Sequence, residues 1–598
     1  MGVAILACLL VCVSAAAAVI PPAAAPASEL AALVERYSTD RQSLFRRYPV
    51  DYSPERYARL ARFYADWQEE LRAVPFESLS PEGRIDAVLL ANRIAYEQRL
   101  MAREMEWVGR TASLLPFAGR ISALLEARGR LDPMKPAEAA ATLDSVATAI
   151  DTAMKALKRA PAGGGGGGPP AGGKVASSKV AAGGGAASQR ARQINALRAV
   201  EVLSSRKEDL AEWNRFYSGY DPLFTWWNAT SYARADKAMA GYIKALREDV
   251  IGYREGEDEP IVGNPIGREA LVADLASEFI PYRPEDLLAL ADRELAWCER
   301  EMVKASRDMG YGDNWKAALE KVKSDHVEPG RQVDLVRDLA REAEDYLERR
   351  DLISIPPLAK EDWRMIMMSP ERQKVSPFFL GGDQIIVSYP TDAMDYDDKM
   401  MSMRGNNIHF SRATVFHELN PGHHLQGFMT ARYNSHRRAF GTPFWTEGWA
   451  LYWEMLLWDE GFAKSPENRI GMLFWRMHRQ ARIIFSLKFH LGQWTPQQCI
   501  DFLVDRVGHE RANAEAEVRR SFNGTYPPLY QLAYMMGGLQ FRALHAELVG
   551  SGQMTNRAFH DAVLQAGSMP VELVRASVTK EKLPRDFRTS WKFLESRR

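Results

Sequence analysis

The chain has 598 residues, enough for several ordinary domains or for one enzyme with two helical lobes. Its 46% hydrophobic and 26% charged residues are typical of a globular protein, and Lys plus Arg equal Asp plus Glu at 77 each, which argues against a nucleic-acid partner or an acidic ligand. The four cysteines are too few for a disulfide scaffold, and the two outside the N-terminal leader, Cys298 and Cys499, are predicted to be buried thiols.

An apolar run from residue 3 to 18, ending in small residues, predicts a signal peptide over residues 1–18 that is cleaved near Ala18. Two alternatives are an uncleaved membrane anchor and lipidation at Cys8, where the preceding residues faintly resemble a lipoprotein box. No later segment is predicted to cross a membrane. We therefore expect export to the periplasm or the cell exterior, with anchoring through the N-terminus in either alternative.

Residues 19–160 show apolar side chains at helical spacing, interrupted by prolines that start or stop helices at Pro54, Pro75, Pro81 and Pro116. Residues 161–188 are rich in Gly, Ala and Pro and almost free of large apolar side chains, so they cannot offset the entropy lost on ordering. We predict a disordered loop there, inserted between two helices of one lobe, because the helical pattern resumes at residue 189.

Residues 189–370 are again predicted to be helix-rich, and one long helix has its start signal at Pro284 and its stop at Gly310. Residues 371–598 form the remaining region, which contains the motifs described next. Its clearest strand is predicted over Phe378–Tyr389, where β-branched residues lie between a Gly-Gly pair and a proline.

The first motif, FHELNPGHHLQ, spans Phe416–Gln426 and resembles a zinc site with an irregular spacing. A zinc hydrolase needs three protein ligands, an open position for water, and a base to take that water's proton. The common HExxH pattern puts two histidines one helical turn apart with the glutamate beside them. Here His417 and Glu418 match, but the next histidines are His423 and His424.

On an unbroken helix His423 would point about 120° away from His417, and His424 would lie about 10 Å along the axis, so neither would share one metal. Pro421 and Gly422 predict a kink or bulge between them. A distortion that absorbs two residues would return His423 to the position one turn from His417.

The second motif, FWTEGWALYWE, spans Phe444–Glu454 and supplies a third ligand candidate, Glu447. We expect Thr446 or the turn at Pro443 to begin its helix, Gly461 to end it, and Ser411 to cap the helix that carries the first motif. The small side chains of Gly448 and Ala450 should let the second helix approach the first closely enough to share one ion.

HELNPGHHLQ resembles the hallmark HExxPGHH-[LV]-Q of the domain of unknown function 885 (DUF885) family, which by resemblance belongs to the zincin-like metallopeptidases. GHxL after the HE pair recurs in helical relatives and favours His423 over His424 as the second ligand, although His424 stays an alternative. EGWALYWE is similar to the EGFAxYxE run that carries the glutamate ligand of gluzincin aminopeptidases. The resemblance implies a mainly α fold with two helical lobes around a cleft and a small β-sheet.

The chain departs from the family pattern in two places. Residues 482–490 lack the Asp and Gly of RLVVDxGxH, and residues 528–537 differ from PGQALxYKxG. The metal site is therefore supported more strongly than the walls that face the substrate. Helical zincins hold the substrate backbone against an edge strand, so residues 384–388 are either such an edge or an ordinary strand.

The expected roles follow from these motifs. His417, His423 and Glu447 are predicted metal ligands for Zn²⁺, and Glu418 is the predicted base that takes the proton of the attacking water. Glu454, two turns after the third ligand, is either a carboxylate that orients a ligand histidine or an ordinary residue of the helix surface.

By resemblance Tyr534 is predicted to donate a hydrogen bond to the tetrahedral intermediate, with Tyr530 and His490 as competitors. Arg482 and Arg520 are possible ligands of a substrate carboxylate, although most basic residues of this chain should lie on a solvated face. The tryptophans of the two Trp-rich runs, Trp226, Trp227, Trp449 and Trp453, are predicted to be core residues rather than parts of a cofactor site.

The sequence predicts an exported zinc-dependent metallopeptidase, and the resemblance to the helical relatives implies that its substrates are short peptides. Two other functions remain open: a protein that binds metal without catalysis, and a zinc hydrolase of a non-peptide amide or ester.

Overall fold

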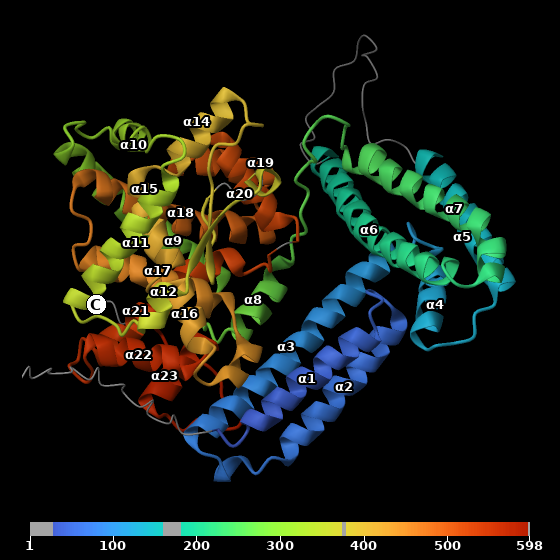
Figure 1. Cartoon of the computed structure of the whole chain (residues 1–598), viewed down its shortest axis with the longest axis horizontal. Coiled ribbons are helices and arrows are strands. Elements are labelled where there is room, and N and C mark those ends of the chain that lie inside the picture. The colour runs from blue at the N-terminus through green and yellow to red at the C-terminus, as the bar shows by residue number, and fades with distance from the viewer. Residues whose placement is uncertain (1–27, 160–180, 374–377, 525, 596–598) are drawn as a thin grey trace, which may run out of the picture.

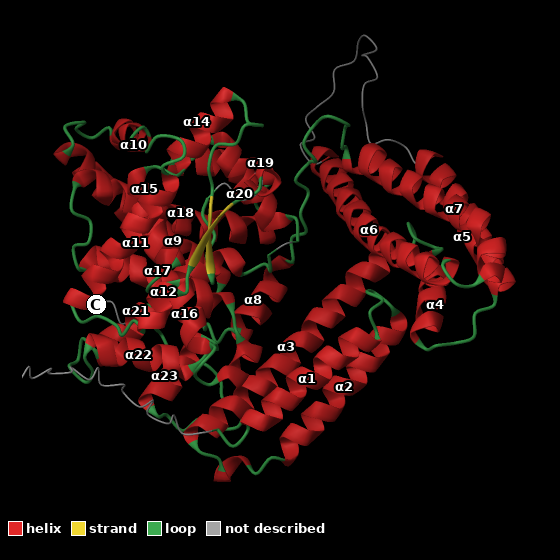
Figure 2. Ribbon diagram, viewed as in Figure 1, coloured by secondary structure: helices red, strands yellow, loops and turns green. Residues whose placement is uncertain are grey.

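The computed structural model describes residues 28–159, 181–373, 378–524 and 526–595, and within them the chain is mainly helical, with only two short strands (Figure 2). The fold-class prediction is therefore confirmed as far as a mainly α protein with a small sheet. The predicted signal peptide, residues 1–18, lies outside the described residues, as does most of the predicted Gly-rich loop. Within the described residues no helix is both long and apolar enough to cross a membrane.

Three long helices begin the described chain and lie side by side (Figure 1). They are α1 (Ala31–Arg47), α2 (Pro54–Ala73) and α3 (Pro81–Thr111), with a 3₁₀ turn, η1 (Phe76–Ser78), before the third. Both α2 and α3 start with proline, which suits the first helical turn because no partner is available there for its missing N–H. A serine caps each of them, so these starts are as the sequence predicted.

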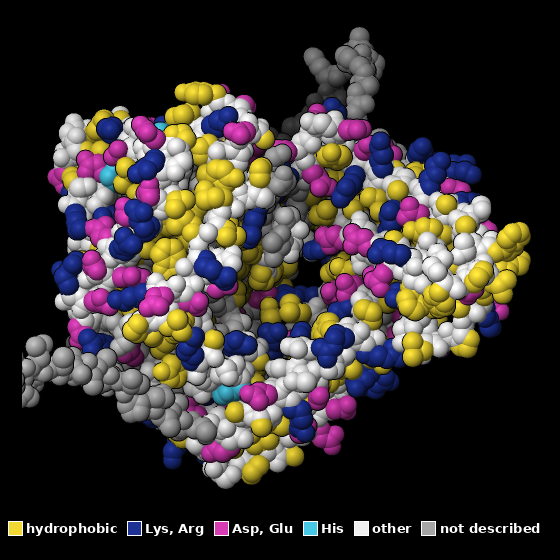
Figure 3. All heavy atoms as spheres, viewed as in Figure 1, with side chains coloured by type: hydrophobic (Ala, Val, Ile, Leu, Met, Phe, Trp, Pro, Cys, Tyr) yellow, Lys and Arg dark blue, Asp and Glu magenta, His cyan; other side chains and the backbone are white. Residues whose placement is uncertain are grey.

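A second group of helices projects from the rest of the molecule as an arm, coloured teal to green in Figure 1. It comprises α4 (Ala118–Gly129), α5 (Pro136–Arg159), α6 (Ala181–Ser218), α7 (Pro222–Ala245) and a π-helical turn, η2 (Leu246–Ile251). The arm has a hydrophobic core of its own, whereas α1–α3 share the core of the main body. The helix α6 begins inside the stretch 161–188 that we predicted to be a loop. The surface is hollowed between the arm and the body (Figure 3).

The remaining helices form the body. They are α8 (Gly267–Ser277), α9 (Pro284–Asp308), α10 (Trp315–Lys323), α11 (Gln332–Arg349), α12 (Pro357–Glu361), α13 (Pro370–Gln373), α14 (Tyr396–Gly405), α15 (Ile408–Glu418), α16 (His423–Thr430), η3 (Ser435–Phe440), α17 (Pro443–Asp459), α18 (Pro466–His490), α19 (Pro496–Phe502), η4 (Leu503–Val507), α20 (Arg511–Phe522), α21 (Tyr530–Leu548), α22 (Asn556–Ala566) and α23 (Val571–Thr579). Helix α18 is buried along nearly its whole length and packs on α9, α15 and α21. It is therefore the central helix of the body.

The sheet consists of β1 (Arg364–Met367) and β2 (Gln384–Val387), which run parallel with Arg364 opposite Gln384. On its other side β2 is bridged at Ile386 by Leu380, in the antiparallel sense. The predicted strand Phe378–Tyr389 is therefore too long, because the chain turns back on itself at the Gly-Gly pair.

Helices α17 and α21 pack with their backbones in near contact. A Cβ atom on Gly448 would lie 2.5 Å from the Cα atom of Gly537, and one on Gly537 would lie 2.1 Å from the carbonyl oxygen of Phe444. The prediction that Gly448 lets α17 approach the helix of the first motif is wrong, since this glycine faces α21. A side chain at either position would force the two helices apart.

The cysteine prediction is confirmed, since Cys298 and Cys499 are both free and buried. The tryptophan prediction holds in part. Trp449 and Trp453 are fully buried, but Trp226 and Trp227 on the arm are 83% and 50% exposed, so they are not core residues.

Candidate metal centre

The first motif is carried by α15, which begins after Asn407. The Asn407 side chain accepts hydrogen bonds from the backbone N–H groups of His409 and Phe410, and so caps the helix. The prediction of Ser411 as the cap is wrong, because that residue lies inside the helix. The helix ends at Glu418, so His417 and Glu418 are its last two residues.

Between α15 and α16 the chain leaves the helix for four residues, Leu419–Gly422, which include a cis bond before Pro421. The N–H of Gly422 donates to the carbonyl oxygen of Phe416 at 3.1 Å. A Cβ atom at this glycine would lie 1.8 Å from the carbonyl oxygen of His417, so only glycine fits. The predicted kink is thus a complete break between two helices, and His423 is the first residue of the second.

Helix α17 carries Glu447. Its start at Pro443 is one of the two alternatives predicted, and the side chain of Thr442 caps it by accepting from the N–H of Trp445 at 3.3 Å. Thr446, the other alternative, lies inside the helix. Gly461, with φ +76°, follows the end of the helix as expected.

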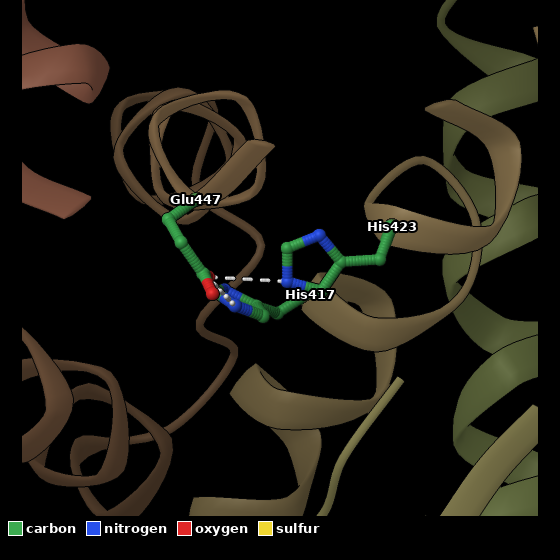
Figure 4. Close-up of side chains that lie close together, drawn as sticks. All are labelled: His417, His423 and Glu447. Carbon is green, nitrogen blue, oxygen red and sulfur yellow. Dashed lines mark ion pairs between the residues drawn. The ribbon is translucent and has the colours of Figure 1, made fainter. Parts of the chain in front are cut away.

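The three helices bring His417, His423 and Glu447 together, and Figure 4 shows the side chains converging from separate helices. Oε2 of Glu447 lies 3.6 Å from Nε2 of His417 and 3.2 Å from Nε2 of His423. Ligands about 2.1 Å from one tetrahedral ion lie about 3.4 Å from each other, so this spacing suits a metal such as Zn²⁺. Oε2 is also buried without a hydrogen-bond partner, as an oxygen reserved for a cation would be.

Two further side chains hold the cluster in place. The Oε1 atom of Glu454 lies 2.7 Å from Nδ1 of His417, which leaves Nε2 of that imidazole to face the cluster. The hydroxyl of Tyr530 donates to Oε1 of Glu447, which leaves Oε2 free to face the histidines. Both contacts have the form of the outer hydrogen bonds that orient metal ligands in proteins.

The cluster attracts positive charge. Burial opposes the charged form of His417, but the carboxylates of Glu447 and Glu454 outweigh it and raise the pKa of this imidazole to about 9. Burial alone would raise the pKa of Glu447, yet His423 and His417 hold it well below its usual range. Such a site retains positive charge strongly, whether as protons or as a metal cation.

Glu418 lies beside the cluster in a cavity of about 430 Å³. Burial raises the pKa of its carboxyl group. Gly381 lies against this residue, since a Cβ atom there would lie 2.1 Å from Oε2 of Glu418 and 2.9 Å from its Cα atom. The backbone at Gly381 therefore packs directly on Glu418. The cavity wall here comes from residues 378–382, which precede β2, rather than from the predicted edge at 384–388.

The other predicted site residues are distributed as follows. Tyr534 lines the cavity, and its ring stacks near that of His417 with centroids 6.2 Å apart. His424 is turned away from the cluster, with Nε2 at 2.8 Å from the carbonyl oxygen of Ala359. His490 is buried against Phe522 and is not among the residues that line the cavity.

Gly381 and Arg479 contact predicted site residues in this cavity, and the sequence analysis singled out neither as a site residue. Gly381 showed only as half of a Gly-Gly pair that bounds a strand. Arg479 is three residues before Arg482 on α18, so both lie on one face of that helix and line the cavity together. Helical spacing from a residue already singled out would have found it.

A mainly helical fold with a His, His, Glu cluster and a buried glutamate in one cavity defines a candidate metalloprotein. The chain matches the family described as "Bacterial protein of unknown function (DUF885)" over residues 43–578, and it belongs to that family. This confirms the family half of the resemblance seen in the first motif.

Among solved structures, a suspected lipoprotein of unknown function from Shewanella oneidensis has the same fold. It is 17% identical, with a TM-score of 0.66, over 92% of this chain and 100% of that one. A suspected lipoprotein from Colwellia psychrerythraea is 18% identical over 75% of this chain and 76% of that one, with a TM-score of 0.47. No curated protein matches the sequence.

Proposed function

We propose that the protein is a zinc-dependent metallopeptidase that hydrolyses short peptides. The observation that carries the proposal is the convergence of two imidazole nitrogens and one unpartnered carboxylate oxygen beside Glu418 in a single cavity. His417, His423 and Glu447 would hold the ion. Bound zinc supplies a Lewis acid with one open position.

Glu418 is the proposed base. It directly follows a ligand histidine, it is buried, and its carboxyl group lines the cavity. Its carboxylate takes the proton of the attacking water and then delivers a proton to the nitrogen of the departing amine. The contact with Gly381 limits where the carboxylate can lie, and so keeps it aimed at one position.

Two tyrosines have different proposed roles: one positions a metal ligand and the other donates a hydrogen bond to the substrate. Tyr530 bonds to Glu447 and so positions a ligand. Tyr534 lines the cavity and stacks near His417, and it is the proposed donor to the oxygen that becomes negative as the peptide carbonyl is attacked. Guanidinium groups of Arg479 and Arg482 lie 4.5 and 4.4 Å from the centre of its ring and favour an anionic transition state there.

We also propose that the protein is exported. The support is the apolar leader together with a protein of the same fold that is described as a suspected lipoprotein. The alternatives of cleavage, anchoring and lipidation are separated by the mass of the mature N-terminus.

The test of the zinc site is metal stoichiometry by mass spectrometry on the protein and on four variants. We expect about one zinc in the parent, loss of zinc in His417→Ala, His423→Ala and Glu447→Gln, and retention in His424→Ala, which is the matched control because its imidazole faces away. A parent that holds no zinc after zinc is supplied would overturn the proposal.

The test of catalysis is a peptide-library digest with the parent and Glu418→Gln. Cleavage at defined bonds by the parent, lost in a variant that keeps its zinc, supports the peptidase function and the role of Glu418. Zinc binding without any cleavage favours one of the two other functions: a metal-binding protein without catalysis, or a hydrolase of another amide or ester.

A further inference from the structure

Three arginine side chains form one wall of the cavity next to Tyr534. Arg479 and Arg482 come from α18 and Arg520 from α20, and they are only 7%, 2% and 9% exposed. We call them the arginine cluster. Three buried cations so close together need anions as partners, because a buried charge is stable only when it is paired and hydrogen-bonded.

The protein supplies two of these anions. Glu517 accepts a hydrogen bond from Nε of Arg482 at 2.7 Å, and its other oxygen lies 2.7 Å from Nε of Arg520. Glu454 accepts from Arg479 at 3.3 Å. Three cations thus share two carboxylates, and one positive charge of the cluster is not balanced by a carboxylate in contact with it.

The cluster also has hydrogen-bond donors to spare. Nη1 of Arg482 and Nε of Arg479 are buried and have no hydrogen-bond partner. A buried donor without a partner is unfavourable, and nearly all such groups in native proteins are satisfied by some ligand, water or protein atom. Guanidinium groups that line a cavity and outnumber the carboxylates in contact with them are suited to a further carboxylate, which guanidinium groups bind in pairs of hydrogen bonds.

The position of the cluster relates this carboxylate to the metal centre. The guanidinium carbon of Arg482 lies 4.4 Å from the ring centre of Tyr534, and that ring lies 6.2 Å from the ring of His417. The cation is therefore within about 11 Å of the imidazole, a span of no more than about three residues of extended peptide.

We propose that the arginine cluster binds the C-terminal carboxylate of the peptide substrate, so that the bond cleaved lies within three residues of that end. The inference rests on the proposed function and specifies its substrate class: peptides with a free C-terminus. A peptide presented in the reverse direction would bring its α-ammonium group against the cluster, and like charge would repel it.

The experiment measures binding, so that it does not depend on turnover. Zinc-supplied full-length Glu418→Gln is titrated by calorimetry with an N-acetylated alanine tripeptide, once with a free C-terminal carboxylate and once as the C-terminal amide. We expect the free acid to bind about 10- to 100-fold more tightly than the amide, since charge-assisted hydrogen bonds are lost in the amide. Equal binding, or no binding of the free acid at millimolar concentration, would overturn the proposal.

Variants of the arginines test whether the cluster is the group that prefers the free acid over the amide. Arg520→Gln, made in the same background, should lose most of the preference for the free acid while its affinity for the amide changes by less than about twofold. The matched control is Arg511→Gln, on the same helix but exposed and outside the cavity, which should keep the full preference. A preference that survives in Arg520→Gln and in Arg482→Lys would place the carboxylate elsewhere and refute the assignment.

Digestion with the wild-type protein separates this proposal from the peptidase proposal. Fragments of one to three residues released from the C-terminus support both. Cleavage far from the C-terminus refutes the carboxylate assignment and leaves the peptidase function intact. A clear preference for the free acid without any cleavage refutes the peptidase function and retains the carboxylate site.

Discussion

Replacing Gly381 by alanine tests whether the position of Glu418 governs turnover. The added Cβ atom would lie 2.1 Å from Oε2 of Glu418 and 2.9 Å from its Cα and Cβ atoms, so rotation of the carboxyl group alone does not relieve the overlap. Non-bonded atoms need about 3.5 Å, which means a shift of more than about 1 Å in that carboxylate oxygen. The backbone at Gly381 is not in the left-handed region, so the effect is steric.

A misplacement of about 1 Å in a catalytic group costs on the order of 100-fold in rate, and we expect kcat to fall by about that factor. The assay is steady-state hydrolysis of a peptide taken from the library digest, with zinc content measured on the same samples. The control is Gly427→Ala, which also lines the cavity but adds a Cβ atom with no neighbour within 4 Å. Unchanged kcat in Gly381→Ala would refute the idea that this contact positions the base.

Three other changes probe the surroundings of the site. Glu454→Gln weakens the partner of His417 Nδ1, and we expect zinc affinity, measured by competition with a chelating dye, to fall about 10- to 100-fold. Burial raises the pKa of Glu517, but two buried arginines outweigh burial and hold that pKa at about 2. The ionised Glu517 therefore contributes its full stability above about pH 4.5, and this contribution is lost as the pH falls toward 2. In urea unfolding, Glu517→Gln should be about 3 kcal/mol less stable at pH 7 and should lose less stability than the wild type between pH 5 and 3. Gly537→Ala, whose Cβ atom would lie 2.8 Å from the Cα atom of Gly448, should lower the free energy of unfolding by about 1 to 3 kcal/mol without changing the zinc stoichiometry.

Local signals predicted much of the helical framework. Prolines at the first position of α2, α3 and α9, and glycine after the last turn of α9, act through the backbone of the helix itself, so no tertiary information was needed. The cap of α15 was missed because both Asn407 and Ser411 are suitable cap residues, and the hydrophobic pattern between them does not show where the helix begins.

The candidate site was predictable as a set of residues but not as an arrangement. Whether His423 or His424 faces His417 depends on the path of the four residues between α15 and α16. Helical periodicity gives the relative directions of side chains only within a single helix, so it could not decide between the two histidines. Gly448 was predicted to pack against the wrong helix, because a small residue indicates that another helix packs closely there but does not show which helix it is. Arg482 and Arg520 were singled out from the sequence, but their grouping with Arg479 was not, because the carboxylate of Glu517 that pairs Arg482 with Arg520 lies on a different helix from Arg482.

The break between α15 and α16 bears on how firmly the metal centre is held together. In a single HExxH helix, the hydrogen bonds of that helix keep two ligands in register even without an ion. Here the register of His417 and His423 depends on the turn Leu419–Gly422, so in the proposed zinc form the ion itself ties α15, α16 and α17 to one another. If the proposed zinc is bound there, we expect local unfolding of α16 and release of the ion to be coupled, so that a higher concentration of free zinc makes opening of that helix rarer.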